Sequence, residues 1–113
     1  MKAQIMRRMS QPSGGAGAQT VTLDKYPYIQ LIEWSRFTAL VEDGDATLIE
    51  IGFRLAASEY ILRSLKITNA GQSLTVIGPC CIPGEAQPFA RFTGTAAGEV
   101  LAFYAYGCGD EHE

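Results

Sequence analysis

The stretch Thr47-Leu48-Ile49-Glu50-Ile51-Gly52-Phe53-Arg54-Leu55 decides the fold class of this 113-residue chain. From Ile49 onward, large apolar side chains fall on every second residue, and glutamate, glycine and arginine take the positions between them. Successive side chains of a β-strand point to opposite faces, so this alternation predicts a strand with one buried face. That face consists of Ile49, Ile51, Phe53 and Leu55.

Similar β-prone segments lie on both sides of this stretch, and turn signals rich in Gly, Pro, Asn or Asp separate them. No amphipathic helix is evident. About seven strands at intervals of roughly 8–13 residues are typical of an all-β antiparallel sandwich or barrel. The other predicted strands span residues 20–23, 28–40 (one bent strand or two), 60–68, 72–78, 89–93 and 100–106.

The segments between these strands are predicted as turns or loops. Residues 42–45 and 69–71 form turns, and residues 56–59 form a short connection with room for one helical turn. Residues 79–84 form a loop because two prolines interrupt any strand pairing. In the strand 60–68 we expect Ile61, Leu65 and Ile67 to point inward, with Arg63 near a sheet edge.

Composition places the chain among soluble globular domains. Charged residues make up 19% and hydrophobic residues 47% of the sequence, which is enough apolar material for one core. We predict neither a secretory signal nor a membrane span, because no sufficiently long apolar run is present. Without an export signal, the odd set Cys80, Cys81 and Cys108 is interpreted as reduced thiols in a cytosolic environment.

The charge is unevenly distributed. Residues 1–19 contain three basic residues and no acid, whereas the other 94 residues carry a formal charge of −6. We predict a flexible basic N-terminal arm at 1–19 with a glycine-rich linker at 10–19, a β-domain at 20–107 and an acidic tail at 108–113. The arm is either a solvated tail or a segment that docks on an acidic neighbour. Nucleic acid is a less favoured partner, because the arm has no aromatic residues.

No motif for a catalytic, cofactor or metal site is present. The one histidine, His112, lies next to the C-terminus, where an imidazole is poorly held for catalysis. Cys80, Cys81, Cys108 and His112 permit a zinc hypothesis, but adjacent cysteines do not easily reach one ion. The acids of residues 42–45 lack the later ligands of a calcium loop. We therefore predict a non-enzymatic protein without a cofactor.

The aromatic residues allow two interpretations. Phe103, Tyr104 and Tyr106, with Tyr26 and Tyr28, either pack in the core and on sheet faces or form an exposed patch that docks protein or sugar.

Three segments carry a resemblance to a known class of proteins. They are 51–71, beginning Ile-Gly-Phe-Arg-Leu-Ala-Ala-Ser-Glu-Tyr, then Pro83-Gly84-Glu85, and then 91–101, Arg-Phe-Thr-Gly-Thr-Ala-Ala-Gly-Glu-Val-Leu. In texture and strand order, residues 45–106 resemble the small β-sandwich virion proteins of tailed bacteriophages, including capsid decoration (cement) proteins.

The resemblance implies a jelly-roll-like fold and a non-enzymatic role in stabilising a capsid lattice. It implies a homo-oligomer that binds the major capsid protein or another virion protein, and a location in the virion after assembly in the host cytoplasm. Many weak contacts on a repeating lattice gain from avidity. We expect the arm to make these contacts, through Lys2, Arg7 and Arg8, with Tyr26 and Tyr28 where it meets the body.

Other functions remain open from the sequence. They are a tail or head–tail joining protein, a carbohydrate- or receptor-binding module using Trp34 or Tyr106, a small metal-dependent enzyme, and a cytosolic subunit of another complex.

Overall fold

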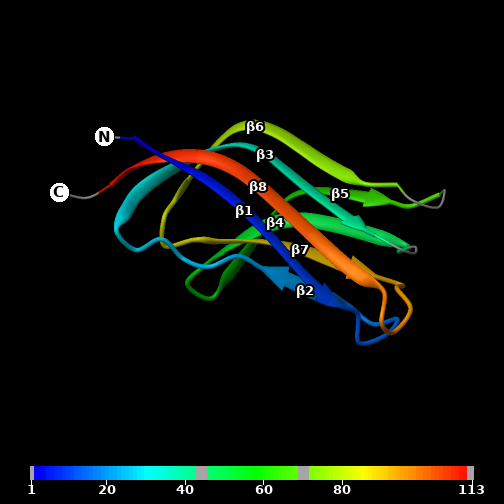
Figure 1. Ribbon diagram of the computed structural model, residues 1–113. Coiled ribbons are helices and arrows are strands. Elements are labelled where there is room, and N and C mark those ends of the chain that lie inside the picture. The colour runs from blue at the N-terminus through cyan, green and yellow to red at the C-terminus, as the bar shows by residue number, and fades with distance from the viewer. Residues whose placement is uncertain (1, 43–45, 69–71, 112–113) are drawn as a thin grey trace.

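The computed structural model describes residues 2–42, 46–68 and 72–111, which form two packed layers of β-strands (Figure 1). No helix in these ranges is long and apolar enough to cross a membrane. The strands are β1 (Lys2–Pro12), β2 (Gln19–Thr22), β3 (Ile29–Val41), β4 (Leu48–Leu55), β5 (Ser58–Lys66), β6 (Leu74–Pro83), β7 (Gln87–Thr93) and β8 (Val100–Glu111).

The strands form two antiparallel sheets with nested pairing. Sheet A has the order β1-β8-β3-β6 and sheet B the order β2-β7-β4-β5. The innermost pair is β4 with β5, and β3 with β6, β2 with β7 and β1 with β8 enclose it in turn. This pattern is one long hairpin rolled into two layers, which is the jelly roll. The predicted all-β antiparallel sandwich is confirmed, with eight strands in place of about seven.

The core lies between the inner faces of the two sheets. In sheet A, the Trp34 and Phe37 ring centroids are 5.3 Å apart, and those of Phe37 and Phe103 are 5.9 Å apart. From sheet B, Ile49 and Ile51 are fully buried, as the alternation in β4 predicts. Burial of each such side chain stabilises the fold by about 1.5–3 kcal/mol. The stretch 47–55 supplies part of the sheet B wall of the core, together with Val21, Ala90 and Phe92.

The prediction of a flexible arm at residues 1–19 is wrong for most of its length. β1 pairs with β8 from Lys2 to Pro12, and the Ile5 side chain is only 6% exposed. Alternation did not reveal this strand because its inward positions include Arg7 and Gln11. The Arg7 guanidinium forms an ion pair of 2.9 Å with Asp24, and the Gln11 amide donates to the carbonyl of Thr20. These side chains close one open side of the sandwich.

The glycine-rich segment after β1 is fixed by hydrogen bonds to the β7–β8 loop. The backbone N–H of Ser13 donates to the carbonyl of Glu99 (2.7 Å), and that of Gly94 donates to the carbonyl of Ala16 (2.9 Å). The hydroxyl groups of Ser13 and Thr95 lie 2.6 Å apart and are both buried. These bonds offset the entropy cost that otherwise keeps such a segment flexible.

Two boundaries near the C-terminal half also differ from prediction. β6 continues through residues 79–83, because β6 is an end strand of sheet A and one of its backbone edges needs no partner. β8 extends to Glu111, which pairs with Ile29, so most of the predicted acidic tail belongs to the sandwich.

β3 is one strand, bent at a register shift between Trp34 and Arg36. The predicted turns at 42–45 and 69–71 lie wholly or partly outside the described residues.

β5 departs most from its predicted side-chain pattern. The connection before it is only Ala56–Ala57, since β5 already begins at Ser58. A register shift opposite Ile51 and Gly52 leaves Leu62 without a partner on β4, so Ile61 faces outward and is 44% exposed. Arg63 lies at the sheet edge, as predicted, and donates to the carbonyl of Thr75 on β6.

Candidate interaction surface

The outer face of sheet A carries the two most exposed large hydrophobic side chains among the described residues. Met6, Tyr106, Arg36 and Ile77 are successive cross-strand partners, so they form one row over β1, β8, β3 and β6. The exposed fractions of Met6 and Ile77 are 71% and 78%. The Arg36 guanidinium lies over the Tyr106 ring, 4.9 Å from its centroid. The row therefore has an apolar group at each end and a cation on an aromatic ring in the middle.

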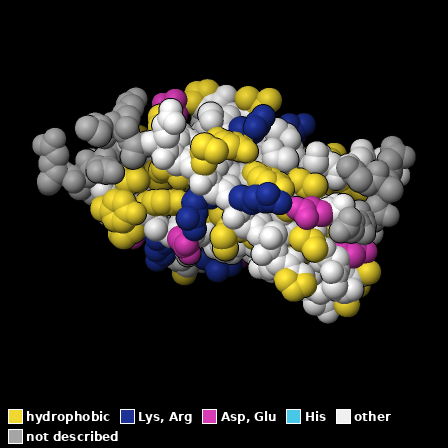
Figure 2. All heavy atoms as spheres, in the orientation of Figure 1, with side chains coloured by type: hydrophobic (Ala, Val, Ile, Leu, Met, Phe, Trp, Pro, Cys, Tyr) yellow, Lys and Arg dark blue, Asp and Glu magenta, His cyan; other side chains and the backbone are white. Residues whose placement is uncertain are grey.

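A second row lies beside the first and has the same arrangement of arginine on tyrosine. Arg8 lies over the Tyr104 ring at 5.2 Å. The Arg8 guanidinium and the Tyr104 hydroxyl both donate to Oε1 of Glu42, at 3.4 and 3.3 Å. In such cation–π contacts the guanidinium is attracted to the ring face, and the two contacts join β8 to its neighbours β1 and β3. Figure 2 shows basic and hydrophobic side chains next to each other in the region of β1 and β8.

The outer face of sheet A is hollowed on both sides of Tyr106. One hollow has a volume of about 310 Å³ and lies over β1, β8 and β3, next to Tyr106. A second hollow of about 400 Å³ lies on the other side of Tyr106. The first is lined by Gln4, Ile5, Met6, Glu33, Ser35, Tyr106, Gly107 and Cys108, and the second by Arg36, Thr38, Leu40, Tyr104 and Tyr106.

The cysteines do not converge. Cys80 and Cys81 are neighbours in β6, so their side chains point to opposite sides of sheet A. Cys81 and Cys108 both pair with Glu33, one on each side of it. Within the described ranges, no group of three or more His, Cys, Asp or Glu side chains is placed to hold a metal ion. His112, the fourth ligand of the zinc hypothesis, lies outside those ranges.

Burial separates the two neighbouring thiols chemically. Cys80 faces the core and is half-buried, whereas Cys81 is exposed. Burial raises the pKa of the Cys80 thiol, and the adjacent Cys81 raises it further.

The predicted contact residues are not brought together. Lys2, Arg7 and Arg8 all lie in β1, but Arg8 faces outward and Arg7 faces inward. Tyr26 and Tyr28 lie between β2 and β3, and their rings meet edge to face at 6.5 Å. Tyr28 is exposed, whereas burial raises the pKa of the Tyr26 hydroxyl. Among the side chains of these five residues that the structure describes, that of Arg8 lies on the outer face of sheet A.

Sequence reasoning found part of this face and missed the rest. Tyr104 and Tyr106 were in the predicted aromatic patch, but Phe103 is fully buried in the core. Trp34, considered for sugar stacking, is also buried. Met6, Arg36 and Ile77 were missed because they come from three strands, and only cross-strand pairing places them in one row.

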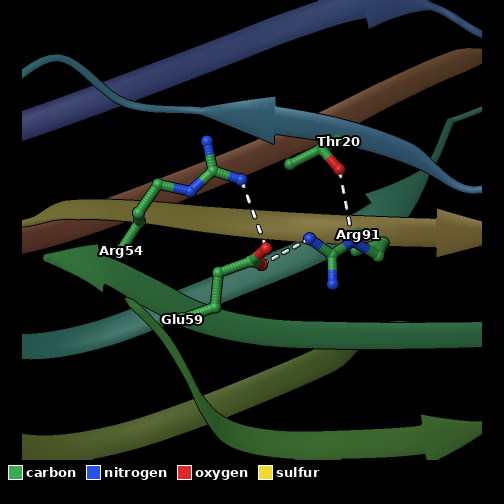
Figure 3. Close-up of polar contacts among 4 residues, drawn as sticks. All are labelled: Thr20, Arg54, Glu59 and Arg91. Atoms are coloured by element: carbon green, nitrogen blue, oxygen red, sulfur yellow. Dashed lines mark hydrogen bonds and ion pairs between the residues drawn. The ribbon is translucent and has the colours of Figure 1, made fainter. Parts of the chain in front are cut away.

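The outer face of sheet B carries a compact ion-pair cluster (Figure 3). Glu59 on β5 accepts hydrogen bonds from Arg91 on β7 and Arg54 on β4. These bonds, that of Arg91 above all, hold the pKa of the Glu59 carboxyl below its ordinary value. Arg91 also lies 4.9 Å from the centroid of the Phe89 ring, which is 1% exposed. The cluster links β7 to the end strand β5, reaching across β4 beside Gly52.

No protein-family model matches the sequence, and no curated protein is similar to it. A chain of the virus-like particle of the extra small virus of the giant freshwater prawn, Macrobrachium rosenbergii, superposes with a TM-score of 0.51 and 12% identity, covering 99% of this chain and 81% of that one. The NLP core of Drosophila gives a TM-score of 0.47 and 10% identity, with 98% and 100% covered. A chain of infectious bursal disease virus gives 0.39 and 6%, with 94% and 32% covered. The first likeness shows a shared fold.

Proposed function

We propose that this chain is a non-enzymatic structural protein of a virus particle, which binds neighbouring virion proteins through the outer face of sheet A. The observation that carries the proposal is the row from Met6 to Ile77, with its exposed apolar ends, together with Tyr106 and Tyr104, whose rings each lie under an arginine. Interface cores are enriched in Tyr, Met and Arg, and exposed apolar patches mark interaction sites.

The fold supports the same proposal. Eight-stranded jelly rolls include viral capsid domains, lectins and cupins, so the fold narrows the choice without deciding it. The fold shared with a chain of a virus-like particle, over 99% of the present chain, favours a capsid role over that of a lectin or cupin. This function places the protein in the virion, after assembly in the host cytoplasm.

Within the particle we propose an accessory position, as a decoration (cement) protein of a tailed-phage capsid. The earlier expectation was contact through a free arm. Residues 2–12 instead form β1, so we propose that Arg8 binds from the sheet face and that Lys2, Arg7, Tyr26 and Tyr28 are secondary contacts. A tail or head–tail joining position differs in copy number, because a joining ring is small and a lattice is large.

The test is to quantify the chain in purified particles of the virus that encodes it. Hundreds of copies per particle support a capsid position, and the small number of copies that forms one ring supports a joining position. Absence from the particle overturns the proposal. The variant Ile77→Lys is expected to lower incorporation at least tenfold. The matched control, Ala97→Lys in the exposed β7–β8 loop, is expected to incorporate normally. Equal incorporation of both variants would contradict the role of the face.

A carbohydrate- or receptor-binding module is the second candidate. It is favoured by the hollow that the partly exposed Tyr104 and Tyr106 line, since sugars stack on aromatic rings. Binding of a glycan by the free chain, lost in Tyr106→Ala and retained in Tyr28→Ala, would support this candidate over a protein-docking face.

A further inference from the structure

We propose that β5 pairs antiparallel with β5 of a second copy, which joins the two B sheets into one continuous sheet. This inference deepens the proposed function, because it names one neighbour in the particle as another copy of this chain. It concerns the open edge of sheet B rather than the outer face of sheet A.

The exposure of β5 is the first observation. β5 ends sheet B, and among the described residues it pairs only with β4. Eight of its nine residues are exposed. Tyr60, Ile61 and Leu62 are consecutive and are 50%, 44% and 37% exposed. An end strand with unpaired backbone groups and apolar side chains is a template for strand addition.

The other three end strands carry features that oppose such pairing. β2 has only four residues. β6 contains Pro79 and Pro83, which have no N–H to donate. β1 carries Arg7 and Arg8 in succession, and charged side chains on an end strand hinder edge-to-edge contact. β5 has no proline and no two adjacent charged residues, and two of its three charged side chains are already partnered, Glu59 by Arg54 and Arg91 and Arg63 by the carbonyl of Thr75.

The bulge at Leu62 selects the register. Partners on β4 show that Ser58, Tyr60, Arg63 and Leu65 face inward, whereas Glu59, Ile61 and Ser64 face outward. When a two-fold axis passes between Ile61 and Leu62, each inward residue of one β5 lies opposite an inward residue of the other copy's β5. Each outward residue likewise lies opposite an outward one. In a strand without the bulge, the same axis would place inward residues of one copy opposite outward residues of the other.

This register is also chemically self-complementary. Ile61 of one copy lies opposite Leu62 of the other, so the exposed apolar side chains meet at the axis. Arg63 lies opposite Tyr60 of the second copy, which allows a cation–π contact. Glu59 lies opposite Ser64, and no two like charges are directly opposed. Because the contact is isologous, each pair occurs twice.

Light scattering after size exclusion tests the dimer with the full-length chain. The wild type is expected to be a dimer that dissociates on dilution. Ile61→Lys is expected to be a folded monomer, with circular dichroism confirming the fold. The control Leu31→Lys changes a side chain of similar exposure, 50%, on sheet A and is expected to remain dimeric. A monomeric wild type, or a dimer unaffected by Ile61→Lys, would overturn the inference.

Disulfide trapping tests the register in a Cys81→Ser background. A mixture of Ser58→Cys and Leu65→Cys chains is expected to form a covalent dimer on oxidation, because these residues are directly opposed. A mixture of Ser58→Cys and Ser64→Cys chains, whose new thiols face opposite sides, is expected to cross-link at least tenfold less. Equal cross-linking would overturn the register. If the chain does not dimerise but is incorporated normally into particles, this inference fails and the proposed function stands. If the chain dimerises but is absent from particles, the proposed function fails and this inference stands.

Discussion

The hydroxyl groups of Ser13 and Thr95 lie 2.6 Å apart in the interior, although 82 positions separate the two residues in the chain. The Ser13 hydroxyl also accepts from the N–H of Gly15 at 3.1 Å, and that of Thr95 donates to the Gly15 carbonyl at 3.1 Å. This small polar cluster ties the glycine-rich segment to the β7–β8 loop.

We predict that Ser13→Ala lowers the free energy of unfolding by about 1–3 kcal/mol, because the Gly15 N–H loses its side-chain acceptor and Thr95 loses a partner. Urea unfolding followed by tryptophan fluorescence measures the change. The same substitution at the exposed Ser10 is the control and is expected to change the free energy by less than about 0.5 kcal/mol. Equal effects at the two positions would contradict a stabilising role for the buried cluster.

Replacing Ala56 by glycine is predicted to stabilise the fold. The φ of Ala56 is +55°, in the left-handed region that an L-residue with a Cβ adopts at a cost. Ala56→Gly is expected to raise the free energy of unfolding by about 0.5–1 kcal/mol, and calorimetry measures the higher Tm. Ala57→Gly is the matched control. Ala57 has no positive φ, so its substitution is expected to lower the Tm.

Glu59 predicts a pH dependence. Its pKa is lowered below the ordinary 4.5 by the hydrogen bond from Arg91, so its contribution to stability is fully present above pH 4.5 and is lost as the pH falls through the lower folded value. The Tm difference between wild type and Glu59→Gln should therefore be largest at neutral pH and shrink in acid. Glu50→Gln, also on sheet B, changes a residue with no ion pair in the described ranges and serves as the control. A difference independent of pH would contradict the prediction.

The two adjacent thiols should react at different rates. Burial raises the pKa of Cys80, and the thiolate is the reactive form, whereas Cys81 is exposed. Iodoacetamide labelling at neutral pH, followed by mass spectrometry, is expected to modify Cys81 at least tenfold faster. In guanidinium the two rates should become similar. Equal rates in the folded protein would show that Cys80 is accessible.

The sequence alone determined the fold class and several strands. The alternation in residues 47–55 predicted β4 and the burial of Ile49 and Ile51, because period-two apolar patterns report directly on a half-buried strand. A period-two apolar pattern did not reveal β1, because the inward positions of that end strand carry Arg7 and Gln11. Their partners, Asp24 and Thr20, belong to β2 and its flank. Local pattern cannot show a polar side chain that is stabilised by a distant segment.

The candidate site depended on tertiary structure to a greater degree. The sequence singled out Tyr104, Tyr106 and Arg8 by residue type, but Met6, Arg36 and Ile77 have no local signal. Their alignment in one row follows from the nested pairing of β1, β8, β3 and β6, which brings residues from both ends of the chain onto one sheet. The exposed face of β5 likewise follows from one bulged residue, Leu62, because a single extra residue reverses which side chains face the core.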